Sequence, residues 1–413
     1  MAEASSRRQF LTAASAGAAA LAASSPARVL GANDRISIGL IGCGGRGVGA
    51  HMQAVRQHAK SQNVEVTVVC DPWRVARERA AAKAEEWFGR APRQCVSYRD
   101  VVAREDIDAV MIASCDHQHT THLEAAARAG KHAYCEKPLA RQMDKLKQAC
   151  DAVKTSGIVC QVGTQLRSLP SMTGCRKLYR TGALGSVSRI ERHRNGTRPY
   201  WYSRLKDVRE KDVAWEEFLL DVPMRPFDPA LYSGWYGYRE FSDGPVPGFG
   251  SHYIDLVHYI TGARFPHSAV CLGGTFTWKD EHHFTCPDHV EALWTYPEGF
   301  MVTYSTNFGN GSGDAEAIYG RHGVMNLLPW NKPTVSGAGA VEKGELGEPR
   351  PVEPVPMPDH FLDWFRCMRS GERPNAPIEA GYQHAVAVIM AMKAYDTGRR
   401  QVYDPQKREL REG

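Results

Sequence analysis

The sequence lacks several features that would assign the chain to a specialised class of protein. It has 11 cysteines, an odd number, but no C-x-x-C pair, and it contains neither an internal repeat nor a long run of like charges. The net charge is only +5 and no basic run alternates with aromatic residues, so we expect no nucleic-acid partner. Beyond the N-terminal region no apolar run is long enough to cross a membrane, so we expect no membrane span in the mature protein.

What the chain does have is the composition of an ordinary globular protein. Its 413 residues exceed the size of about 250–300 residues at which single cores stop growing, so we expect two domains. Hydrophobic residues make up 43% of the chain and charged residues 23%, as in average globular domains. Four cysteines (Cys43, Cys70, Cys115 and Cys135) fall on or beside predicted strands. We interpret them as small buried hydrophobic residues.

The N-terminal region has the pattern of a targeting segment. Arg7 and Arg8 precede Phe10 and Leu11, and an uncharged run rich in Ala, Ser and Gly follows. Paired arginines before a short apolar run are typical of a twin-arginine signal peptide, which we place at residues 1–32. We therefore expect a periplasmic protein, or one otherwise exported by this route. The alternative is a basic cytosolic tail followed by an Ala-rich helix.

Residues 33–164 alternate between strand and helix patterns. We predict strands at 36–41, 64–70, 109–114, 131–135 and 158–162, and helices at 48–60, 74–88, 120–129 and 144–155. Strands separated by helices of about 10–15 residues form βαβ units. We therefore predict an α/β fold whose N-terminal domain is a doubly wound parallel sheet of the Rossmann type.

The pattern changes after about residue 165. Alternating strands are predicted at 187–193, 268–276, 291–296 and 300–306, with helices at 360–370 and 378–396. Residues 332–357 are rich in Pro, Gly and Glu and indicate a surface excursion. We expect residues 165–413 to form a second α/β domain with an open, mostly antiparallel sheet and C-terminal helices.

A glycine-rich turn follows the first predicted strand. Gly42, Gly44 and Gly47 form a G-x-G-x-x-G motif that also contains Gly45 and Arg46. In this position glycines allow backbone N–H groups to approach a pyrophosphate at a helix N-terminus. The motif therefore predicts a dinucleotide site, and the alternative is a glycine-rich turn without a ligand.

The end of the second predicted strand indicates which dinucleotide binds. Asp71 lies 24 residues after Gly47, where a carboxylate can accept hydrogen bonds from both ribose hydroxyls of an adenosine. A 2′-phosphate would meet its negative charge, so NAD is favoured over NADP. Arg74 lies close by in the sequence and keeps NADP as the alternative.

Two further polar motifs follow later strands, at the sheet edge where such folds bind ligands. The first contains Ser114, Asp116, His117 and His119. An Asp and two His suggest a Zn or Fe site, but the other ligands are missing and a nicotinamide needs no metal, so we predict none. The second contains Glu136, Lys137 and Pro138. A lysine at a cofactor crevice can have a lowered pKa and take the proton of an alcohol, whereas the alternative is an exposed loop lysine.

Together these motifs resemble the Gfo/Idh/MocA oxidoreductases, the glucose–fructose oxidoreductase and inositol dehydrogenase group. Residues 161–165, 250–255 and 374–379 extend the resemblance into the second domain. The resemblance implies a sugar or cyclitol substrate oxidised at a secondary alcohol, and often a homo-oligomer, here a dimer or tetramer. It implies catalytic roles for Lys137 and His252. The implied cofactor-binding residues beyond the glycine turn, Asp71 and Arg74 are Ser114, Asp116, His119, Glu136, Lys137 and Gln165.

The chain departs from the family at one position. Many members have an Asp four residues before the catalytic His, but this chain has Gly248 there. Asp255 follows His252 by three residues, and we predict that it orients the His252 ring; the alternative is a capping or ion-pairing role. His252, Arg198 and Tyr236 are predicted to bind substrate, although His252 could be a core histidine and the aromatic runs around the other two could equally fill a core.

These observations predict an NAD(P)-dependent oxidoreductase with a tightly bound cofactor. Export makes tight binding necessary, because soluble NAD is not replenished in a periplasm. One alternative is a glycosidase that oxidises a sugar hydroxyl transiently, eliminates at the neighbouring carbon and then reverses the oxidation. Another is a non-enzymatic regulator that senses the cofactor.

Overall fold

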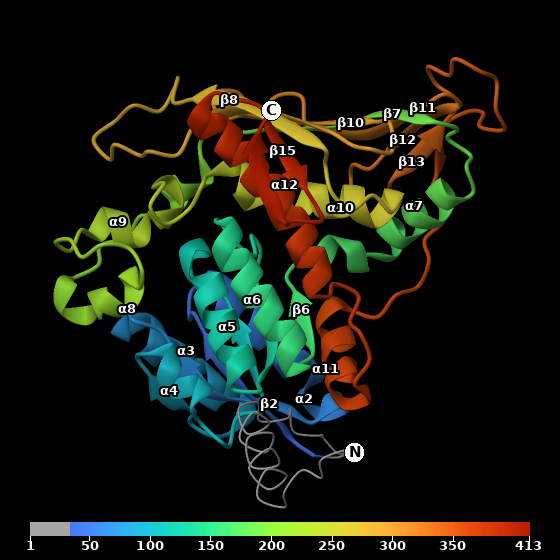
Figure 1. Ribbon diagram of the computed structural model, residues 1–413. Coiled ribbons are helices and arrows are strands. Elements are labelled where there is room, and N and C mark those ends of the chain that lie inside the picture. Colours follow the sequence, from blue (N-terminus) through green and yellow to red (C-terminus); the bar gives the residue numbers. More distant parts are fainter. Residues whose placement is uncertain (1–33) are drawn as a thin grey trace, which may run out of the picture.

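The computed structural model describes residues 34–413, so the predicted signal peptide at residues 1–32 lies outside the described residues. Two separate sheets organise this part of the chain, one in the lower half of Figure 1 and one at the top. Among residues 34–413, no helix is both long enough and apolar enough to cross a membrane.

The first sheet has six parallel strands in the order β3-β2-β1-β4-β5-β6. The strands are β1 (Ile36–Ile41), β2 (Val64–Cys70), β3 (Arg93–Cys95), β4 (Ala109–Ile112), β5 (His132–Cys135) and β6 (Cys160–Val162). The connecting helices are η1 (Gly47–Met52), α2 (Gln53–Gln62), α3 (Arg74–Phe88), α4 (Tyr98–Val102), η2 (Asp116–Gln118), α5 (His119–Arg128) and α6 (Met143–Ser156). This order reverses direction beside β1, which confirms the predicted doubly wound fold.

The central strands of this sheet are apolar because helices cover both faces. All four residues of β4 and of β5 are buried, as expected for a parallel sheet. The helix predicted at 48–60 consists of two segments, the π-helical turn η1 and the α-helix α2 that follows it. The strand β3 and the short helix α4 were not predicted, because two of the three residues of β3 are exposed and α4 is a single short segment.

The second sheet has ten strands in the order β14-β13-β12-β11-β7-β10-β9-β8-β15-β16. They are β7 (Val187–Asn195), β8 (Ser268–Gly274), β9 (His289–Thr295), β10 (Met301–Asn307), β11 (Ala315–Gly320), β12 (Gly323–Asn326), β13 (Thr334–Ser336), β14 (Arg350–Pro351), β15 (Gln401–Asp404) and β16 (Glu409–Glu412). Only β7 and β10 pair in parallel, so the sheet is mostly antiparallel, as predicted. Within residues 332–357, β13 and β14 extend one edge of the sheet, and most residues between them are exposed, as the predicted surface excursion implies.

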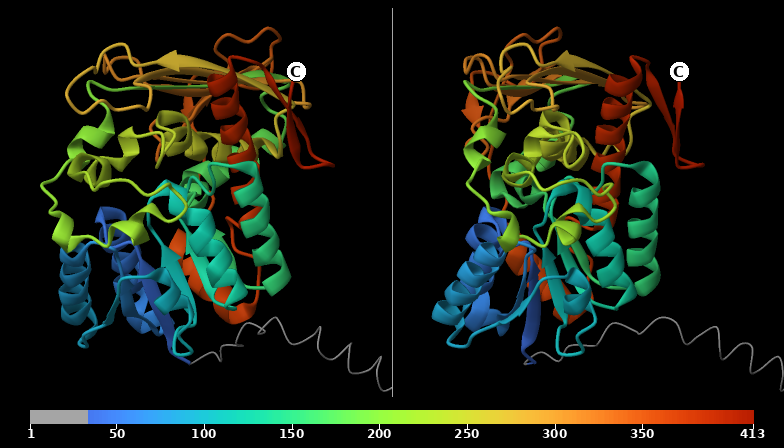
Figure 2. Two further views of the ribbon diagram at one scale, coloured as in Figure 1. Left: turned by 60° about the vertical axis from the view of Figure 1, so that its left-hand side comes forward. Right: turned by 90° about the vertical axis from the view of Figure 1, so that its left-hand side faces the viewer.

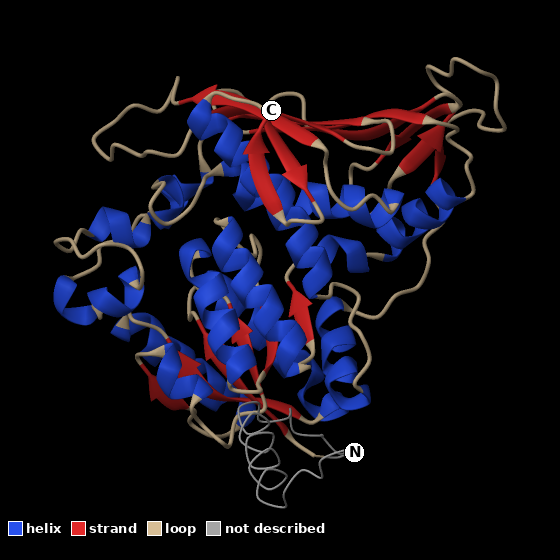
Figure 3. Cartoon of the chain, in the orientation of Figure 1, coloured by secondary structure: helices blue, strands red, loops and turns tan. Residues whose placement is uncertain are grey.

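Helices cover one face of this sheet and leave the other open (Figures 1 and 3). The covering helices are α7 (Pro170–Arg180), which follows η3 (Gln165–Ser168), α10 (Ser251–Thr261) and α12 (Ile378–Thr397). Between β7 and α10 the chain forms η4 (Tyr200–Arg204), η5 (Glu210–Asp212), α8 (Trp215–Leu219), α9 (Pro229–Ser233), η6 (Trp235–Gly237) and η7 (Val246–Gly250). The part of this segment around α8 and α9 descends beside the first domain (Figure 2).

The helix α11 (His360–Ser370) returns to the first domain, although its sequence lies far into the second. Phe361 stacks on Tyr134 of β5 with ring centroids 4.7 Å apart, and Trp364 and Phe365 are fully buried against the same core. All 11 cysteines are free and ten of them are buried, as their interpretation as hydrophobic residues predicted.

Candidate active site

The glycine turn after β1 is shaped by two contacts that only glycine permits. Gly42 has a φ of +96°, and a Cβ atom there would press on the backbone of Ala113. A Cβ atom on Gly47 would collide with the carbonyl oxygen of Gly42. At Gly44, by contrast, a Cβ atom would meet no other atom within 4 Å. The turn is therefore packed tightly on its inner side and bare on its outer side, which fits a pyrophosphate at the helix start.

Asp71 at the end of β2 lies beside this turn. Its Oδ2 accepts a 2.7 Å hydrogen bond from the Cys43 N–H and its Oδ1 accepts a 2.8 Å bond from the Trp73 N–H. Asp71 lines the cavity described below, where it fits the predicted role of binding ribose hydroxyls. Arg74 does not line this cavity, because Glu78 and Asp212 engage its guanidinium group at 2.8 and 2.7 Å.

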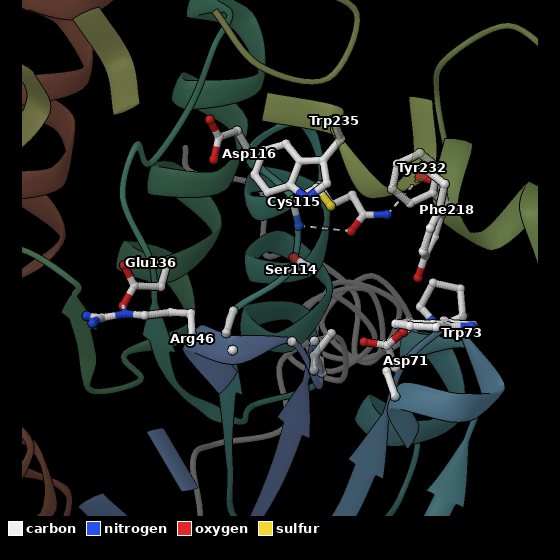
Figure 4. Close-up of a pocket in the computed structure, with 18 of the residues that line it drawn as sticks. Arg46, Asp71, Trp73, Ser114, Cys115, Asp116, Glu136, Phe218, Tyr232 and Trp235 are labelled. Atoms are coloured by element: carbon white, nitrogen blue, oxygen red, sulfur yellow. Dashed lines mark hydrogen bonds and ion pairs between the residues drawn. The ribbon is translucent and has the colours of Figure 1, made fainter. Parts of the chain in front are cut away.

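The glycine turn and Asp71 open onto a single cavity that both domains line. Figure 4 shows Asp71 and Trp73 on one side, Arg46 and Glu136 on the other, and Ser114 between them. The cavity brings together most of the predicted site residues, namely Gly42, Gly44, Gly45, Arg46, Asp71, Ser114, Asp116, His119, Glu136, Lys137, Tyr236 and His252. It lies at the carboxyl ends of the parallel strands, where this type of sheet binds ligands.

Glu136 follows β5 and is almost completely buried. One of its oxygens, Oε1, accepts hydrogen bonds from Arg46 Nε at 2.7 Å, from His51 Nε2 at 2.9 Å and from Gln165 Nε2 at 3.1 Å. Burial opposes ionisation, but the His51 hydrogen bond and the Arg46 charge outweigh it and hold the pKa of Glu136 far below its usual value. Gln165 also bonds to the Tyr134 hydroxyl, so it supports Glu136 and does not itself line the cavity.

Lys137 reaches from the first domain to the second. Its Nζ donates a 2.7 Å hydrogen bond to the carbonyl oxygen of Gly248 in η7. Burial lowers the pKa of Lys137, and the charges of Glu136 and Asp116 oppose this shift only in part. Asp116 is also buried and accepts a 2.9 Å hydrogen bond from Ser242 Oγ. A lysine in this setting keeps a larger share of neutral amine than an exposed one.

His252 lies in the first turn of α10 and lines the same cavity as Lys137. Its Nδ1 is buried and has no hydrogen-bond partner among residues 34–413. Burial, with a contribution from the Lys137 charge, lowers the pKa of His252 well below its usual value. The ring is therefore neutral near pH 7 and can form a hydrogen bond with a ligand without carrying a charge.

The predicted role of Asp255 needs correction. Both of its oxygens bond to Arg167 of η3, at 2.9 Å from Nε and 2.5 Å from Nη2, and both side chains are buried. The carboxylate is occupied by this ion pair and does not orient the His252 ring. Asp255 thus follows the alternative of an ion-pairing residue, which joins α10 to the segment after β6.

His119 and Ser114 are held by the first domain itself. The ring nitrogens of His119 face the carbonyl oxygens of Pro138 at 2.8 Å and Ser114 at 3.1 Å, and Ser114 Oγ bonds to His122 Nδ1 at 3.0 Å. In the part of the chain that the structure describes, no group of three or more His, Cys, Asp or Glu side chains is placed to hold a metal ion.

The aromatic residues of the second domain divide between the cavity and a separate core. Tyr236 lines the cavity and stacks on Trp235 at 3.6 Å. Arg198 does not line it, because its guanidinium group lies over the rings of Tyr202 and Trp278. Three further residues that line the cavity were not predicted from the sequence. They are Arg204 at the end of η4, Lys206 shortly after it, and Tyr232 in α9. Only Tyr232 lies in an aromatic run that pointed to this region.

The fold and this cavity define a two-domain dinucleotide-binding protein, and comparison with known proteins specifies its family. Residues 36–164 match the model of the oxidoreductase family with an NAD-binding Rossmann fold, GFO_IDH_MocA. Residues 219–326 match the GFO/IDH/MocA C-terminal domain. Together the two models cover more than half of the chain, and the chain belongs to the Gfo/Idh/MocA family.

Curated relatives are similar over part of their length. Levoglucosan dehydrogenase from Pseudarthrobacter phenanthrenivorans is 38% identical over 265 residues, which are 61% of this chain and 60% of the relative. The glycosyl hydrolase family 109 protein 2 of Shewanella sp. strain ANA-3 is 31% identical over 134 residues, 31% of this chain and 28% of the relative. The matched segments thus span less than two thirds of either relative.

A solved structure shows the same fold over almost its whole length. The WlbA dehydrogenase from Bordetella pertussis, in complex with NADH and UDP-GlcNAcA, superimposes with a TM-score of 0.66 at 20% sequence identity. The match covers 90% of this chain and 99% of that chain. At this identity the likeness concerns the fold alone.

Proposed function

We propose that the protein is an NAD-dependent oxidoreductase that oxidises a secondary alcohol of a sugar or cyclitol. One observation carries the proposal: Lys137 and His252, from two domains, line the same cavity as the glycine turn and Asp71. A base beside a dinucleotide site, with a second side chain that can bind the alcohol, is what alcohol oxidation requires. The similarity to levoglucosan dehydrogenase supports a carbohydrate substrate.

The side chains of the cavity have separate tasks in this reaction. When bound, oxidised NAD supplies the acceptor for the hydride that leaves the alcohol carbon. Lys137, with its lowered pKa, binds the alcohol oxygen and takes up its proton. His252 lines the same cavity and is neutral, so its ring can form a hydrogen bond with the substrate. The ion pair between buried Glu136 and exposed Arg46 helps to fix the backbone that carries Lys137.

The choice of NAD over NADP is part of this proposal. The Asp71 carboxylate lies at the end of β2, where a 2′-phosphate would bring a second negative charge close to it. Arg74, the residue that kept NADP as the alternative, is paired with Glu78 and Asp212. These contacts support NAD.

The expected cellular location is also a proposal, and it depends on residues 1–32. A twin-arginine signal would export the protein folded, together with a bound cofactor. An exported enzyme would then have to regenerate NAD in place, either with a second substrate or by returning the electrons to the first. Fusion of residues 1–32 to a reporter that is active only after twin-arginine export tests this.

The experiment that tests the function compares two kinds of substrate. Purified protein is incubated with free sugars and cyclitols and with p-nitrophenyl glycosides, while nitrophenol and absorbance near 340 nm are followed. Sugar-dependent formation of NADH supports the dehydrogenase. Release of nitrophenol without net NADH would instead support the glycosidase alternative, which the family 109 relative favours. Binding of NAD with no turnover of either kind would favour a regulator.

We also propose that the protein forms a homo-oligomer through the open face of the second sheet. Exposed apolar side chains lie on three of its strands, including Leu272 at 73% exposure and Met301 and Tyr319 at 38% and 36%. Exposed apolar area of this kind marks interaction surfaces. Sedimentation of the wild type and of a Leu272→Lys variant tests this, since a dimer through this face should dissociate in the variant.

A further inference from the structure

The segment that leaves β7 reaches across to the first domain (Figures 1 and 2). Several of its side chains line the cavity. Residues 200–236 of this segment are called the clasp below. Its side chains that line the cavity include Arg204, Lys206, Phe218, Tyr232 and Tyr236. These side chains therefore come from the second domain, whereas the glycine turn and Asp71 come from the first.

One tether joins the clasp to the turn that follows β2. Asp212 pairs with Arg74 at 2.7 Å, and Val213 forms a β-bridge with Trp73. The Ala214 N–H donates a 3.0 Å hydrogen bond to the Pro72 carbonyl oxygen. This tether lies directly beside Asp71.

A second tether joins the clasp to the segment after β4. The carbonyl oxygen of Phe218 accepts hydrogen bonds from His117 Nε2 and from Gln118 Nε2, both at 2.8 Å. Burial lowers the pKa of His117 to about 3, so its ring is neutral and the Nε2–H donates. The segments that follow β2 and β4 thus both hold the clasp beside the cavity.

Ahead of the first tether in the sequence, the clasp places positive charge near the glycine turn. Arg204 Nη1 lies 3.8 Å from the point where a Cβ atom on Gly45 would stand. Within residues 34–413, Arg204 forms no hydrogen bond or ion pair with the protein. Lys206 Nζ lies 5.8 Å from the centre of the Trp73 ring. An unpaired guanidinium group beside a bare backbone turn is suited to bind an anion between the two.

We propose that the clasp closes the dinucleotide site, with Arg204 binding the pyrophosphate of NAD from the side opposite the glycine turn. The proposal rests on the proposed function only in that NAD is the ligand of this cavity. It assigns cofactor retention to residues of the second domain. A hydrogen bond to a charged group contributes more than a neutral one, so the loss of Arg204 should weaken retention substantially.

The test measures release of NAD from the purified holoprotein. Wild type and the Arg204→Gln variant are diluted and desalted, and bound NAD is quantified over time. Arg225→Gln is the matched control, because Arg225 is an exposed arginine of the clasp that pairs with Glu240 and does not line the cavity. We expect Arg204→Gln to release NAD about ten- to a hundredfold faster than the wild type, and Arg225→Gln to release it at the wild-type rate.

Competition by ADP and by adenosine shows which part of NAD the Arg204 side chain binds. ADP contains the diphosphate and adenosine does not, so Arg204→Gln should weaken competition by ADP and leave competition by adenosine unchanged. If Arg204→Gln releases NAD at the wild-type rate and its melting temperature is unchanged, the proposed role of the clasp in retaining NAD is wrong. The proposed function would then remain intact. A wild type that neither contains nor binds NAD would overturn both.

Discussion

The hydroxyl group of Tyr200 fills the space that a side chain on Gly248 would occupy. It donates a long hydrogen bond, at 3.4 Å, to the Gly244 carbonyl oxygen, and its ring packs edge-on against Tyr236 at 5.4 Å. Gly248 is also the residue whose carbonyl oxygen binds Lys137. The glycine at which the chain departs from the family pattern thus packs against a tyrosine from η4.

A double-mutant cycle tests this relationship. Gly248→Ala should destabilise the protein by about 1–3 kcal/mol, because the new methyl group must displace the Tyr200 hydroxyl. In the Tyr200→Phe background the same change should cost less than about 1 kcal/mol, since the hydroxyl is gone. Urea denaturation of the four proteins measures both costs. Equal costs in the two backgrounds would show that the two residues do not compete for this space.

Asp255 should matter for stability and not for proton transfer. Asp255→Asn leaves Arg167 as a buried charge without its partner, so we expect a loss of about 3–5 kcal/mol in the free energy of unfolding. The pH dependence of turnover in any folded fraction should stay as in the wild type. A stable Asp255→Asn variant with a shifted pH profile would restore the role in orienting His252.

Turnover should rise with pH as Lys137 loses its proton. The neutral amine is the proton acceptor, and burial lowers its pKa, so the midpoint should fall below the ordinary lysine value of about 10.4. Lys137→Ala should reduce kcat by about 10²–10⁴-fold. A Lys137→Ala variant with full turnover would remove the proposed role of this residue.

A variant of Asp116 provides a second test of the Lys137 titration. Its negative charge raises the pKa of Lys137, so Asp116→Asn should move the midpoint of the pH–rate profile to lower pH. The asparagine oxygen can still accept the Ser242 hydroxyl, which preserves the local hydrogen bond. Comparison of the two pH–rate profiles at constant ionic strength measures the shift, and a shift to higher pH would contradict the assignment of this limb to Lys137.

Cofactor preference should depend on Asp71. Asp71→Ser removes the charge that would repel a 2′-phosphate and retains a hydroxyl that can accept a backbone hydrogen bond. We expect the ratio of NADP to NAD affinity to rise at least about tenfold, which corresponds to ~1.4 kcal/mol. Titration calorimetry with both dinucleotides measures it. An unchanged ratio would show that another group selects the cofactor.

Much of the first domain could be predicted because its information is local. A continuous apolar strand such as β1, the glycine turn after it and the acidic end of β2 are each defined by neighbouring residues. Their order along the chain fixes which strand ends meet at the cavity. The short strand β3 carries no such pattern, since Arg93 and Gln94 are exposed and polar.

The rest of the site depends on contacts between distant segments. The spacing of Asp255 and His252 on α10 suggested that Asp255 orients the His252 ring. It gave no information on Arg167, which lies 88 residues earlier in the chain and pairs with Asp255. Arg198 and Arg204 belong to the same loop, and only tertiary packing determines that the second one faces the glycine turn. The contact between Tyr200 and Gly248 could not be predicted either, although Tyr200 lies in an aromatic run that pointed to this loop.

The cofactor content of the purified protein shows whether the chain binds NAD, on which all the proposed roles of the cavity residues depend. The protein is denatured, the supernatant is assayed for NAD(H), and the melting temperature of the remaining sample is measured with and without added NAD. We expect about one dinucleotide per chain, or a clear rise in melting temperature on addition of NAD if some sites have lost it. Absence of any dinucleotide, together with a melting temperature that added NAD does not change, would contradict this expectation.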